Sequence, residues 1–283
     1  MFTSKKRYFN GKVVIITGAS SGIGLATARQ FAKLHSKIVL AARSEDKLVS
    51  IQKELSEFTE VIYCKTDVSI ESECKNLIDT TLSTFGKIDI LINNAGISMR
   101  ALFIDLDLIV IKRLMDVNFW GTVYCTKYAL PHLIESRGSV VGVISTAGYK
   151  GLPGRTGYSS SKFAINGFLD TLRVEHLYDG LHVMIFAPGF TASNIRKTAL
   201  GAHGQEQGET PRDESKMMTA EMVAKIMIRR IKRRAKRATL TPVSKVLLVM
   251  TRLFPVLTDH LEYWYMAREP DSPFKQRSEL KKK

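Results

Sequence analysis

The stretch that most constrains the fold runs from Lys12 to Ala32. It begins with the apolar, β-branched run Val13–Ile16, continues through the glycine-rich turn Thr17–Gly24, and ends with the composition of a helix. This order predicts a buried strand, a tight turn and a helix. Glycines let the backbone approach a ligand closely, and the free amide groups at a helix start attract a diphosphate. The stretch therefore predicts a diphosphate-binding turn in an α/β fold.

The same order of apolar run and helical segment repeats along the chain. Strands are expected at 37–43, 61–64, 88–92, 139–144, 181–187 and 238–241, and helices at 46–58, 70–85, 106–134 and 219–234. Apolar strands separated by helices predict a parallel sheet covered on both faces. We expect one α/β domain, a doubly wound parallel sheet over residues 11–241, between an N-terminal tail (1–10) and a C-terminal helical extension (242–283).

Polar residues follow several of these strands. They are the turn Thr17–Gly24 with Arg43, Asp67, Asn94, Ser145 and Pro188–Gly189. A parallel sheet binds ligands at the carboxyl ends of its strands, so these residues predict one site. In dinucleotide-binding folds an arginine in the place of Arg43 accommodates a 2′-phosphate, whereas an acidic residue would bind the ribose hydroxyl. We expect NADP(H) rather than NAD(H); the alternative is that Arg43 only begins a surface loop.

Three side chains between residues 145 and 162 could share one proton-transfer site. Tyr158 and Lys162 are four residues apart in a helical segment, so their side chains leave the same face. A nearby ammonium favours the phenolate, which would move the pKa of Tyr158 from about 10 toward neutral pH. Ser145 ends an apolar run, where a strand would place its hydroxyl for a hydrogen bond to a substrate carbonyl. Alone, a Tyr-x-x-x-Lys pair more often decorates a surface, so the site depends on the rest of the chain.

Asn118 lies in an apolar setting between Val117 and Phe119 and needs hydrogen-bond partners there. It could hold a bend in the helix or a water near the active centre. Farther on, the polar segment 199–215 has few side chains with which to build a core, and we interpret it as a mobile lid.

Positive charge is concentrated near the C-terminus. The formal net charge is +15, and the cations cluster between Lys225 and Arg237 and at Lys281–Lys283. Such runs suit acidic partners such as nucleic acid or anionic lipid. A nucleotide-sensing or nucleic-acid-binding protein on the same fold is therefore an alternative. The cations are not interleaved with aromatic residues that could stack bases, which disfavours nucleic acid.

The C-terminal extension contains the apolar run Val246–Leu257, which Arg252 and Pro255 interrupt. This run is too short and broken for a membrane-spanning helix. With Tyr263–Tyr265 and the flanking cations, it could lie in a membrane interface, against a second subunit or on its own domain. We expect the tail, residues 225–283, to attach the protein reversibly to anionic membrane surfaces without spanning them.

The chain has neither metal-ligand spacing nor a secretion signal. Cys64, Cys74 and Cys125 form no paired framework, and their odd number suits a reducing compartment. No apolar segment of signal-peptide type follows the charged N-terminus. We expect no metal, and residence in the cytoplasm with membrane contact through the tail.

Across residues 10–240 the chain resembles the short-chain dehydrogenase/reductase family, whose fold is Rossmann-like. The motifs occur in family order: Thr17-Gly-x-x-x-Gly22-x-Gly24, Asp67, Asn93-Asn94-Ala95-Gly96, Asn118, Ser145, Tyr158-x-x-x-Lys162 and Pro188-Gly189. The resemblance implies that Tyr158 is the general acid/base and that Ser145 orients the carbonyl. It also implies that Lys162 lowers the pKa of Tyr158 and binds the nicotinamide ribose, while Asn118 supports a proton-relay water.

The resemblance also implies the cofactor contacts and the reaction. The contacts would come from Gly18, Ser20, Ser21, Gly22, Ile23, Gly24, Arg43, Asp67, Val68, Asn94, Ala95, Gly96, Tyr158, Lys162, Pro188, Gly189 and Thr191. We expect NADPH-dependent reduction of a hydrophobic ketone, such as a 3-oxo lipid, a 3-ketosphinganine-like molecule or a steroid. The alternative within enzymes is an NAD-dependent alcohol dehydrogenase. A homodimer or homotetramer is expected, because four apolar residues resemble the family's subunit-contact helix: Phe163, Phe168, Leu169 and Leu172.

Overall fold

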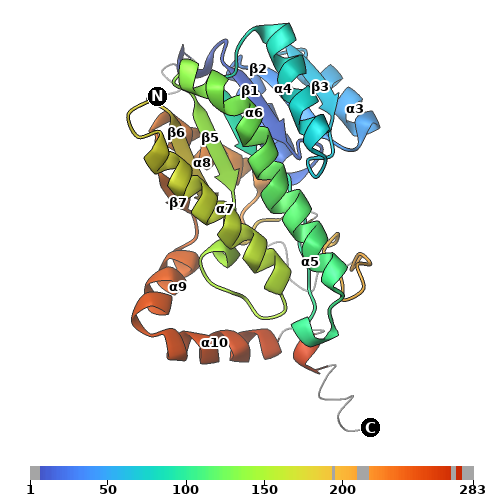
Figure 1. The fold of residues 1–283 in the computed structure, drawn as a ribbon, viewed down its shortest axis with the longest axis vertical. Helices are drawn as coiled ribbons and strands as arrows, with labels where there is room; N and C mark the ends of the chain where they lie inside the picture. Colours follow the sequence, from blue (N-terminus) through green and yellow to red (C-terminus); the bar gives the residue numbers. More distant parts are fainter. Residues whose placement is uncertain (1–6, 193–194, 209–216, 269–271, 276–283) are drawn as a thin grey trace.

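The computed structural model of the protein describes residues 7–192, 195–208, 217–268 and 272–275. Within these ranges, seven parallel strands form one sheet in the order β3-β2-β1-β4-β5-β6-β7 (Figure 1). The strands are β1 (Val13–Thr17), β2 (Lys37–Ala42), β3 (Val61–Lys65), β4 (Ile90–Asn93), β5 (Ser139–Val143), β6 (His182–Ala187) and β7 (Arg237–Thr239). The strand order reverses between β1 and β4, so the predicted doubly wound parallel sheet is confirmed.

Helices cover both faces of the sheet. The helices of the described ranges are α2 (Gly22–Ala32), α3 (Glu45–Leu55), α4 (Glu71–Phe85), α5 (Leu108–Leu114), α6 (Gly121–Glu135), α7 (Thr156–Glu175), α8 (Ala220–Lys232), α9 (Pro242–Leu253) and α10 (Pro255–Ala267). Along β1, Val14 and Ile16 pack toward α2, α3 and α8, whereas Val13 and Ile15 pack toward α4, α6 and α7. Successive side chains of a strand point to opposite faces, so both sets are buried. Each such side chain stabilises the fold by roughly 1.5–3 kcal/mol.

Two of the four residues expected at a subunit contact lie on the inner face of α7. Leu169 and Leu172 are buried against the sheet, so they are unavailable to a second subunit and that expectation is wrong for both. Phe168 is half-buried, with its ring centre 6.4 Å from that of Phe119. Phe163 is exposed.

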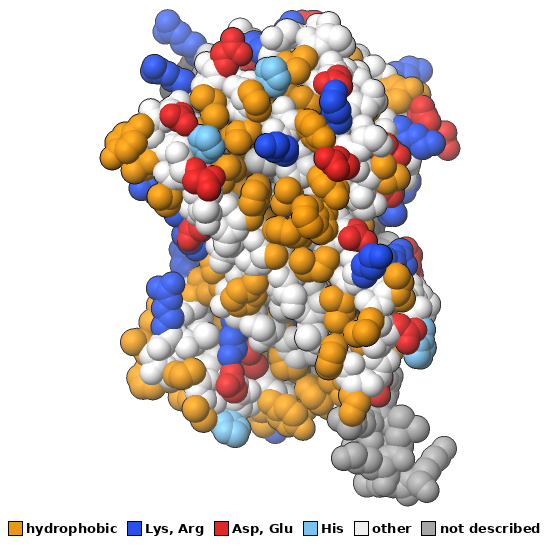
Figure 2. Space-filling model, viewed as in Figure 1, with side chains coloured by type: hydrophobic (Ala, Val, Ile, Leu, Met, Phe, Trp, Pro, Cys, Tyr) orange, Lys and Arg blue, Asp and Glu red, His pale blue; other side chains and the backbone are white. Residues whose placement is uncertain are grey.

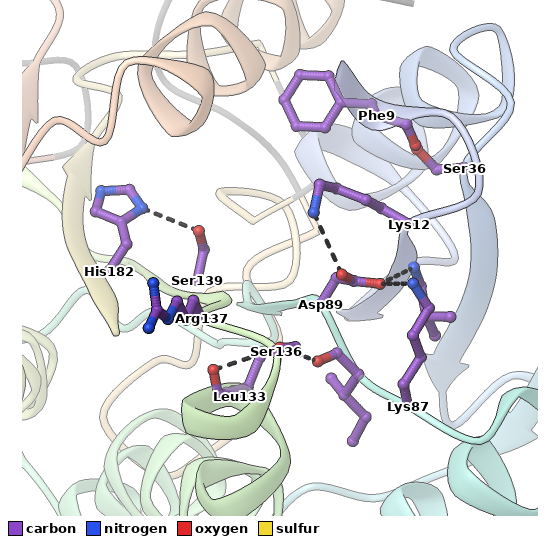
Figure 3. Close-up of polar contacts among 12 residues, drawn as sticks. Phe9, Lys12, Ser36, Lys87, Asp89, Leu133, Ser136, Arg137, Ser139 and His182 are labelled. Carbon is purple, nitrogen blue, oxygen red and sulfur yellow. Dashed lines mark hydrogen bonds and ion pairs between the residues drawn. The ribbon is translucent and has the colours of Figure 1, made fainter. Parts of the chain in front are cut away.

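The amino ends of the strands are closed by buried polar side chains (Figure 3). The carboxylate of Asp89 pairs with Lys12 at 3.3 Å and with Lys87 at 2.9 Å. Nearby, the ring of His182 lies 3.0 Å from the hydroxyl of Ser139, and burial lowers the pKa of His182 to about 4. This edge is therefore occupied by satisfied polar contacts, and the opposite, carboxyl edge is left for ligands.

The long helix expected over 106–134 is divided. Between α5 and α6, residues Met115–Trp120 form a π-helical segment, η2, and a short 3-10 segment, η1 (Phe103–Asp105), precedes α5. A π segment adds one residue to a helical turn and changes which side chains face inward, and such segments are frequent at functional sites. Asn118 lies within it and is fully buried.

The segment expected to be a lid, 199–215, is described only up to residue 208. The amide of Leu200 donates to Ser98 and its carbonyl accepts from Arg100, both at 2.8 Å. The Leu200 side chain packs with Met99 and Val110. Backbone hydrogen bonds thus attach Leu200 to a loop that is distant in sequence, and the interpretation of 199–215 as a lid stays a prediction. Residues 209–215 lie outside the described ranges.

The amino end of the folded domain lies before the expected boundary. Phe9, expected in a terminal tail, is fully buried and stacks edge-on against Phe31, so the folded domain begins before residue 11. In the C-terminal extension, α9 and α10 meet at Phe254 and lie beyond the carboxyl ends of the strands (Figure 1). Within the described ranges, we find no helix that is long and apolar enough to span a membrane.

Candidate active site

The turn between β1 and α2 has the conformation that its glycines predict. Gly18 has φ of +66° and Gly22 has φ of +53°, a region that side chains rarely adopt. A Cβ atom on Gly24 would overlap the carbonyl oxygen of Gly18, so glycine lets α2 approach the turn. Ser21 at the N-cap makes no side-chain capping bond, and the first turn of α2 contains no acidic residue. The amide groups there suit an anion, so the turn, with Ser20 and Ile23, fits a diphosphate.

A threonine connects this turn to the segment that follows β4. The Oγ1 of Thr17 accepts hydrogen bonds from the amides of Asn94 and Ala95, both at 3.0 Å. The side-chain amide of Asn94 donates to the carbonyls of Thr17 at 3.0 Å and Gly18 at 3.3 Å. Gly96 is the last residue of this segment. A Cβ atom there would lie 3.0 Å from the side-chain oxygen of Asn118, so glycine allows the close approach. Two predicted cofactor segments are thus held together at the switch point of the sheet.

Arg43 and Asp67 lie at the carboxyl ends of β2 and β3. Arg43 is exposed, and within the described ranges it makes no hydrogen bond or ion pair. Asp67 accepts hydrogen bonds from the amide of Ser69 at 3.0 Å and from its hydroxyl at 2.7 Å. Val68 is buried against Gly121. The two strand ends lie on the same edge as the glycine turn, because β1, β2 and β3 pair in parallel.

Ser145 and Tyr158 meet at the carboxyl end of β5. Ser145 begins the short 3-10 segment η3 (Thr146–Gly148), and its Oγ accepts a hydrogen bond from the Ala147 amide at 3.2 Å. Tyr158 lies in the first turn of α7 and is half-buried. Burial raises the pKa of Tyr158, and the hydrogen bond from Ser145 together with the charges of Arg155 and Arg196 opposes that rise.

Lys162 lies one helical turn after Tyr158 and is only 3% exposed. Its Nζ donates to the carbonyl of Val143 at 2.9 Å and lies 5.9 Å from the centre of the Tyr158 ring. Burial lowers the pKa of Lys162 from 10.5 to about 8. The groups that lower the pKa of Tyr158 are therefore a serine and two arginines, while the ammonium is itself desolvated.

Asn118 joins three elements through its side-chain amide. Its oxygen accepts from the Ile97 amide at 2.8 Å, and its nitrogen donates to the Ile97 carbonyl at 3.0 Å. The same nitrogen donates to the hydroxyl of Ser161 at 2.9 Å, and Ser161 donates to the carbonyl of Tyr158 at 2.8 Å. Asn118 thus connects the π segment and the loop after β4 to α7, and its expected support of a proton-relay water stays a prediction.

The end of β6 completes the edge. After Pro188, Gly189 has φ of +78°, and a Cβ there would lie 2.8 Å from the Cγ2 of Thr241. Thr191 is buried, and its carbonyl accepts a hydrogen bond from the buried guanidinium of Arg196 at 2.8 Å.

The structure therefore gathers all the predicted site residues along one edge of the sheet. Ser145, Tyr158, Lys162 and Asn118 form a contiguous group near its middle, whereas Arg43 lies apart, beyond β2. Sequence reasoning missed Arg155, Ser161 and Arg196. Arg155 lies three residues before Tyr158, and Ser161 lies between Tyr158 and Lys162, so their closeness to the motif is a signal, whereas Arg196 belongs to no motif. No group of three metal-ligating side chains is found in the described part of the chain.

The comparisons with known proteins agree with this geometry. Residues 12–202 match the model of the short chain dehydrogenase family. The 11-beta-hydroxysteroid dehydrogenase-like 4A of Arabidopsis thaliana is 37% identical over 217 residues, which are 76% of this chain and 72% of that protein. The 11-beta-hydroxysteroid dehydrogenase A of Sesamum indicum is 39% identical over 188 residues, 65% of this chain and 54% of that protein. The chain thus spans only about half of some of its curated relatives.

Solved structures show the same fold. A short chain dehydrogenase/reductase from Burkholderia phymatum in complex with NAD has a TM-score of 0.79 and 25% identity, covering 88% of this chain and 95% of that one. An alcohol dehydrogenase from Thermococcus sibiricus complexed with 5-hydroxy-NADP has a TM-score of 0.74 and 25% identity, covering 83% of this chain and 98% of that one. The chain belongs to the short-chain dehydrogenase/reductase family of oxidoreductases, which use NAD(H) or NADP(H).

Proposed function

We propose that the protein uses NADPH to reduce a ketone on a hydrophobic molecule to the alcohol. The observation that carries the proposal is the convergence of Ser145, Tyr158 and Lys162 on the edge that also holds the glycine turn. When bound, the nicotinamide cofactor supplies the hydride for the carbonyl carbon. The chain's own residues orient the carbonyl and deliver the proton.

Ser145 and Tyr158 act on the carbonyl oxygen. Ser145 Oγ accepts from the Ala147 amide and donates to Tyr158 in the absence of substrate, so its one proton must turn to the carbonyl oxygen when the substrate binds. Tyr158 then donates the phenolic proton to the same oxygen as negative charge develops there. The products at this centre are the alcohol and a phenolate, which must be reprotonated. Lys162 binds the nicotinamide ribose and faces the phenol, and Asn118 supports the water through which the proton is replaced.

Arg43 supports NADP(H) over NAD(H). Its guanidinium is exposed beside the glycine turn and is not engaged by another described side chain, so it suits a 2′-phosphate. The test is a fluorescence titration of the purified protein with NADPH and NADH. Arg43→Ala should weaken NADPH binding by about tenfold or more and leave NADH nearly unchanged. Lys47→Ala, on the exposed side of α3, is the matched control. Tighter binding of NADH than of NADPH by the wild type would contradict the assignment and favour the NAD-dependent alcohol dehydrogenase.

The apolar residues around Tyr158 support a hydrophobic substrate. Tyr158 packs at the margin of a buried cluster that includes Met99, Leu106 and Leu200. Two relatives carry the name 11-beta-hydroxysteroid dehydrogenase, which motivates steroids as test compounds. A screen with NADPH should compare steroid, 3-oxo lipid and 3-ketosphinganine-like ketones with small polar ketones. Turnover confined to the small polar ketones would contradict the substrate class.

Replacement of the phenol tests catalysis directly. Tyr158→Phe should lower kcat by about 10²–10⁴-fold, since the general acid is lost. Tyr128→Phe removes a hydroxyl that bonds only Glu71 at the surface and should retain activity. If Tyr158→Phe reduced the ketone panel as fast as the wild type, the proposed reaction would be wrong.

The outer faces of α9 and α10 suit an anionic membrane surface. Their exposed apolar and aromatic side chains are Val243, Val246, Val249, Leu253, Phe254, Val256, Leu257, Leu261, Tyr263, Trp264 and Tyr265. Figure 2 shows hydrophobic side chains gathered along this lower edge of the molecule. Exposed Lys245, Arg252 and Arg268 accompany them, while Lys150 pairs with Asp259. Large exposed apolar patches bordered by polar residues mark protein or membrane contact sites.

The structure separates this face from the basic run 225–237. Arg234 donates to the carbonyl of Arg137, just before β5, so the end of α8 lies at the amino edge of the sheet. A membrane contact therefore rests on α9 and α10 rather than on the whole tail. Co-sedimentation with anionic vesicles should fall when Val246 and Leu257 are both replaced by Ser. Equal, negligible binding to anionic and neutral vesicles would exclude the membrane contact. It would leave a second subunit as the partner that covers the outer faces of α9 and α10.

We also propose a cytoplasmic homodimer or homotetramer with the domain division at about residue 241. The exposed Phe163 on α7 supports a subunit contact there. Light scattering at micromolar concentration should give a multiple of the 31.7 kDa chain mass. A monomeric mass would contradict the assembly, and Phe163→Asp should produce one if α7 forms the contact.

A further inference from the structure

Hydroxyl groups connect the catalytic serine segment to the C-terminal extension. Thr146 follows Ser145, and its Oγ1 lies 2.8 Å from the Oγ of Ser244 in α9. The Oγ1 of Thr241, the N-cap of α9, donates to Ser244 Oγ at 2.6 Å and accepts from the Ser244 amide at 3.2 Å. Ser244 is only 4% exposed. The three hydroxyls form a chain from the start of α9 to the segment that carries Ser145.

The bonds among the three hydroxyls are within their donor and acceptor capacity. Each hydroxyl has one proton to donate and two lone pairs to accept with. Thr241 donates to Ser244, and either hydroxyl can be the donor between Ser244 and Thr146. A buried hydroxyl that both accepts and donates favours one geometry, since any displacement leaves a polar group unpaired.

The three hydroxyls of Thr146, Thr241 and Ser244 lie against the end of β6. A Cβ atom on Gly189 would lie 2.9 Å from the Oγ1 of Thr241 and 3.4 Å from the Oγ of Ser244. Glycine is therefore required where the proposed cofactor segment meets the hydroxyls. Three strand ends, those of β5, β6 and β7, meet at this point.

A second connection joins the same segment to α10. Lys150, two residues after η3, forms an ion pair with Asp259, and its Nζ lies 4.0 Å from a carboxylate oxygen of Glu262. Lys150 is largely buried. The extension thus contacts the segment 146–150 at both of its ends, through α9 at Thr146 and through α10 at Lys150.

We propose that Thr146 and Ser244 are positioning residues, through which α9 holds the segment that presents the Ser145 hydroxyl to the substrate carbonyl and to Tyr158. The inference rests on the proposed function, because it gives a role in that reaction to a residue of the extension. Neither side chain touches the reacting atoms in this scheme. A displacement of about 1 Å at a catalytic group can lower a rate about 10²-fold, so the bond has a measurable effect on turnover.

The kinetic test compares variants that each lack one buried hydroxyl. Ser244→Ala and Thr146→Val should each lower kcat for ketone reduction about tenfold, with KM for NADPH changed less than about twofold. The double variant should be no slower than either single variant, because both remove the same bond. Thr258→Ala is the matched control, since this buried hydroxyl of α10 donates to the carbonyl of Phe254, the N-cap residue of the same helix. Additive losses in the double variant, or an equal loss in Thr258→Ala, would overturn the inference.

Hydrogen–deuterium exchange supplies a measurement that needs no turnover. The Ala147 amide donates to Ser145, so a loosened segment should exchange faster in the peptide that covers residues 145–150. Ser244→Ala should show this and Thr258→Ala should not; unchanged exchange in Ser244→Ala would contradict the inference. A wild-type protein that reduces no ketone would contradict the proposed function itself. An active wild type with a fully active Ser244→Ala variant would contradict only the positioning role.

Discussion

The ammonium of Lys162 faces the ring of Tyr158, with Nζ 5.9 Å from the ring centre, while its hydrogen bond goes to the carbonyl of Val143. The cation is thereby fixed between the catalytic helix and the end of β5. Burial lowers the pKa of Lys162 to about 8, which means that the fold disfavours the charge it contains. The proposed reaction therefore uses a buried ammonium whose burial destabilises the fold.

Lys162→Met should stabilise the cofactor-free protein while abolishing catalysis. Below pH 8 the buried charge destabilises the fold by on the order of 3 kcal/mol, and loss of the donor to Val143 offsets part of the gain, so we expect a net gain of about 1–2 kcal/mol. Between pH 8 and 10.5 the unfolded chain holds the proton that the folded chain has released, so the wild type gains stability as pH rises. Urea unfolding should show a smaller difference in stability between the variant and the wild type at pH 10 than at pH 7. A variant less stable than the wild type at pH 7 would contradict the prediction.

Arg155→Gln should move the alkaline limb of the pH–rate profile for reduction to higher pH. Reduction requires protonated Tyr158, so the rate falls as pH rises through its pKa. Burial raises that pKa, and the charge of Arg155 opposes the rise. Without that charge, the limb should shift to higher pH.

The control for this experiment is Arg173→Gln, whose guanidinium pairs with Asp170 near the far end of α7. Its profile should match that of the wild type. Arg155 also donates to Ser98 at 2.8 Å and Met99 at 2.7 Å, so a lower rate alone would report on loop geometry. An unshifted limb in Arg155→Gln would exclude the electrostatic role.

The sheet could be predicted because its signal is local and redundant. Runs such as Val13–Ile16 are apolar on both faces, since both faces are covered, and glycine at residues 18, 22 and 24 marks the turn. The π segment could not be predicted in the same way. The sequence places a polar residue, Asn118, in an apolar segment, but its bonds to Ile97 and Ser161 join parts of the chain that only the fold brings together.

Contacts made by backbone groups or by single hydroxyls also could not be predicted from the sequence. Leu200 is attached to the loop after β4 by amide and carbonyl groups that every residue possesses, so the segment around it looked unstructured. Thr146 and Ser244 belong to no motif, and only the fold brings them together. The Ser145, Tyr158 and Lys162 set was accessible because catalysis requires particular residue types at particular spacings.

Gly24→Ala should lose cofactor binding, whereas Gly167→Ala should not. The added Cβ at residue 24 would overlap the Gly18 carbonyl and lie 2.7 Å from the side-chain nitrogen of Asn94, so the turn must deform. At residue 167 in α7 the Cβ would meet open space, and alanine should add up to about 1 kcal/mol of stability. Isothermal titration with NADPH and thermal unfolding of both variants check this; near-normal affinity in Gly24→Ala would contradict the close approach.

Glu262→Gln should stabilise the protein at pH 8 and have little effect at pH 4. Burial in α10 raises the pKa of Glu262 from 4.5 to about 7, and the charge of Asp259 adds to the rise while Lys150 opposes it. Between these pH values the folded chain binds a proton that the unfolded chain has released, so wild-type stability falls as pH rises and levels off above 7. Glutamine removes that loss, which is on the order of 1–3 kcal/mol. Asp259→Asn is the informative comparison, because Asp259 is exposed and pairs with Lys150, so its loss should not stabilise. A Glu262→Gln protein whose stability fell with pH as steeply as that of the wild type would show that another group governs the transition.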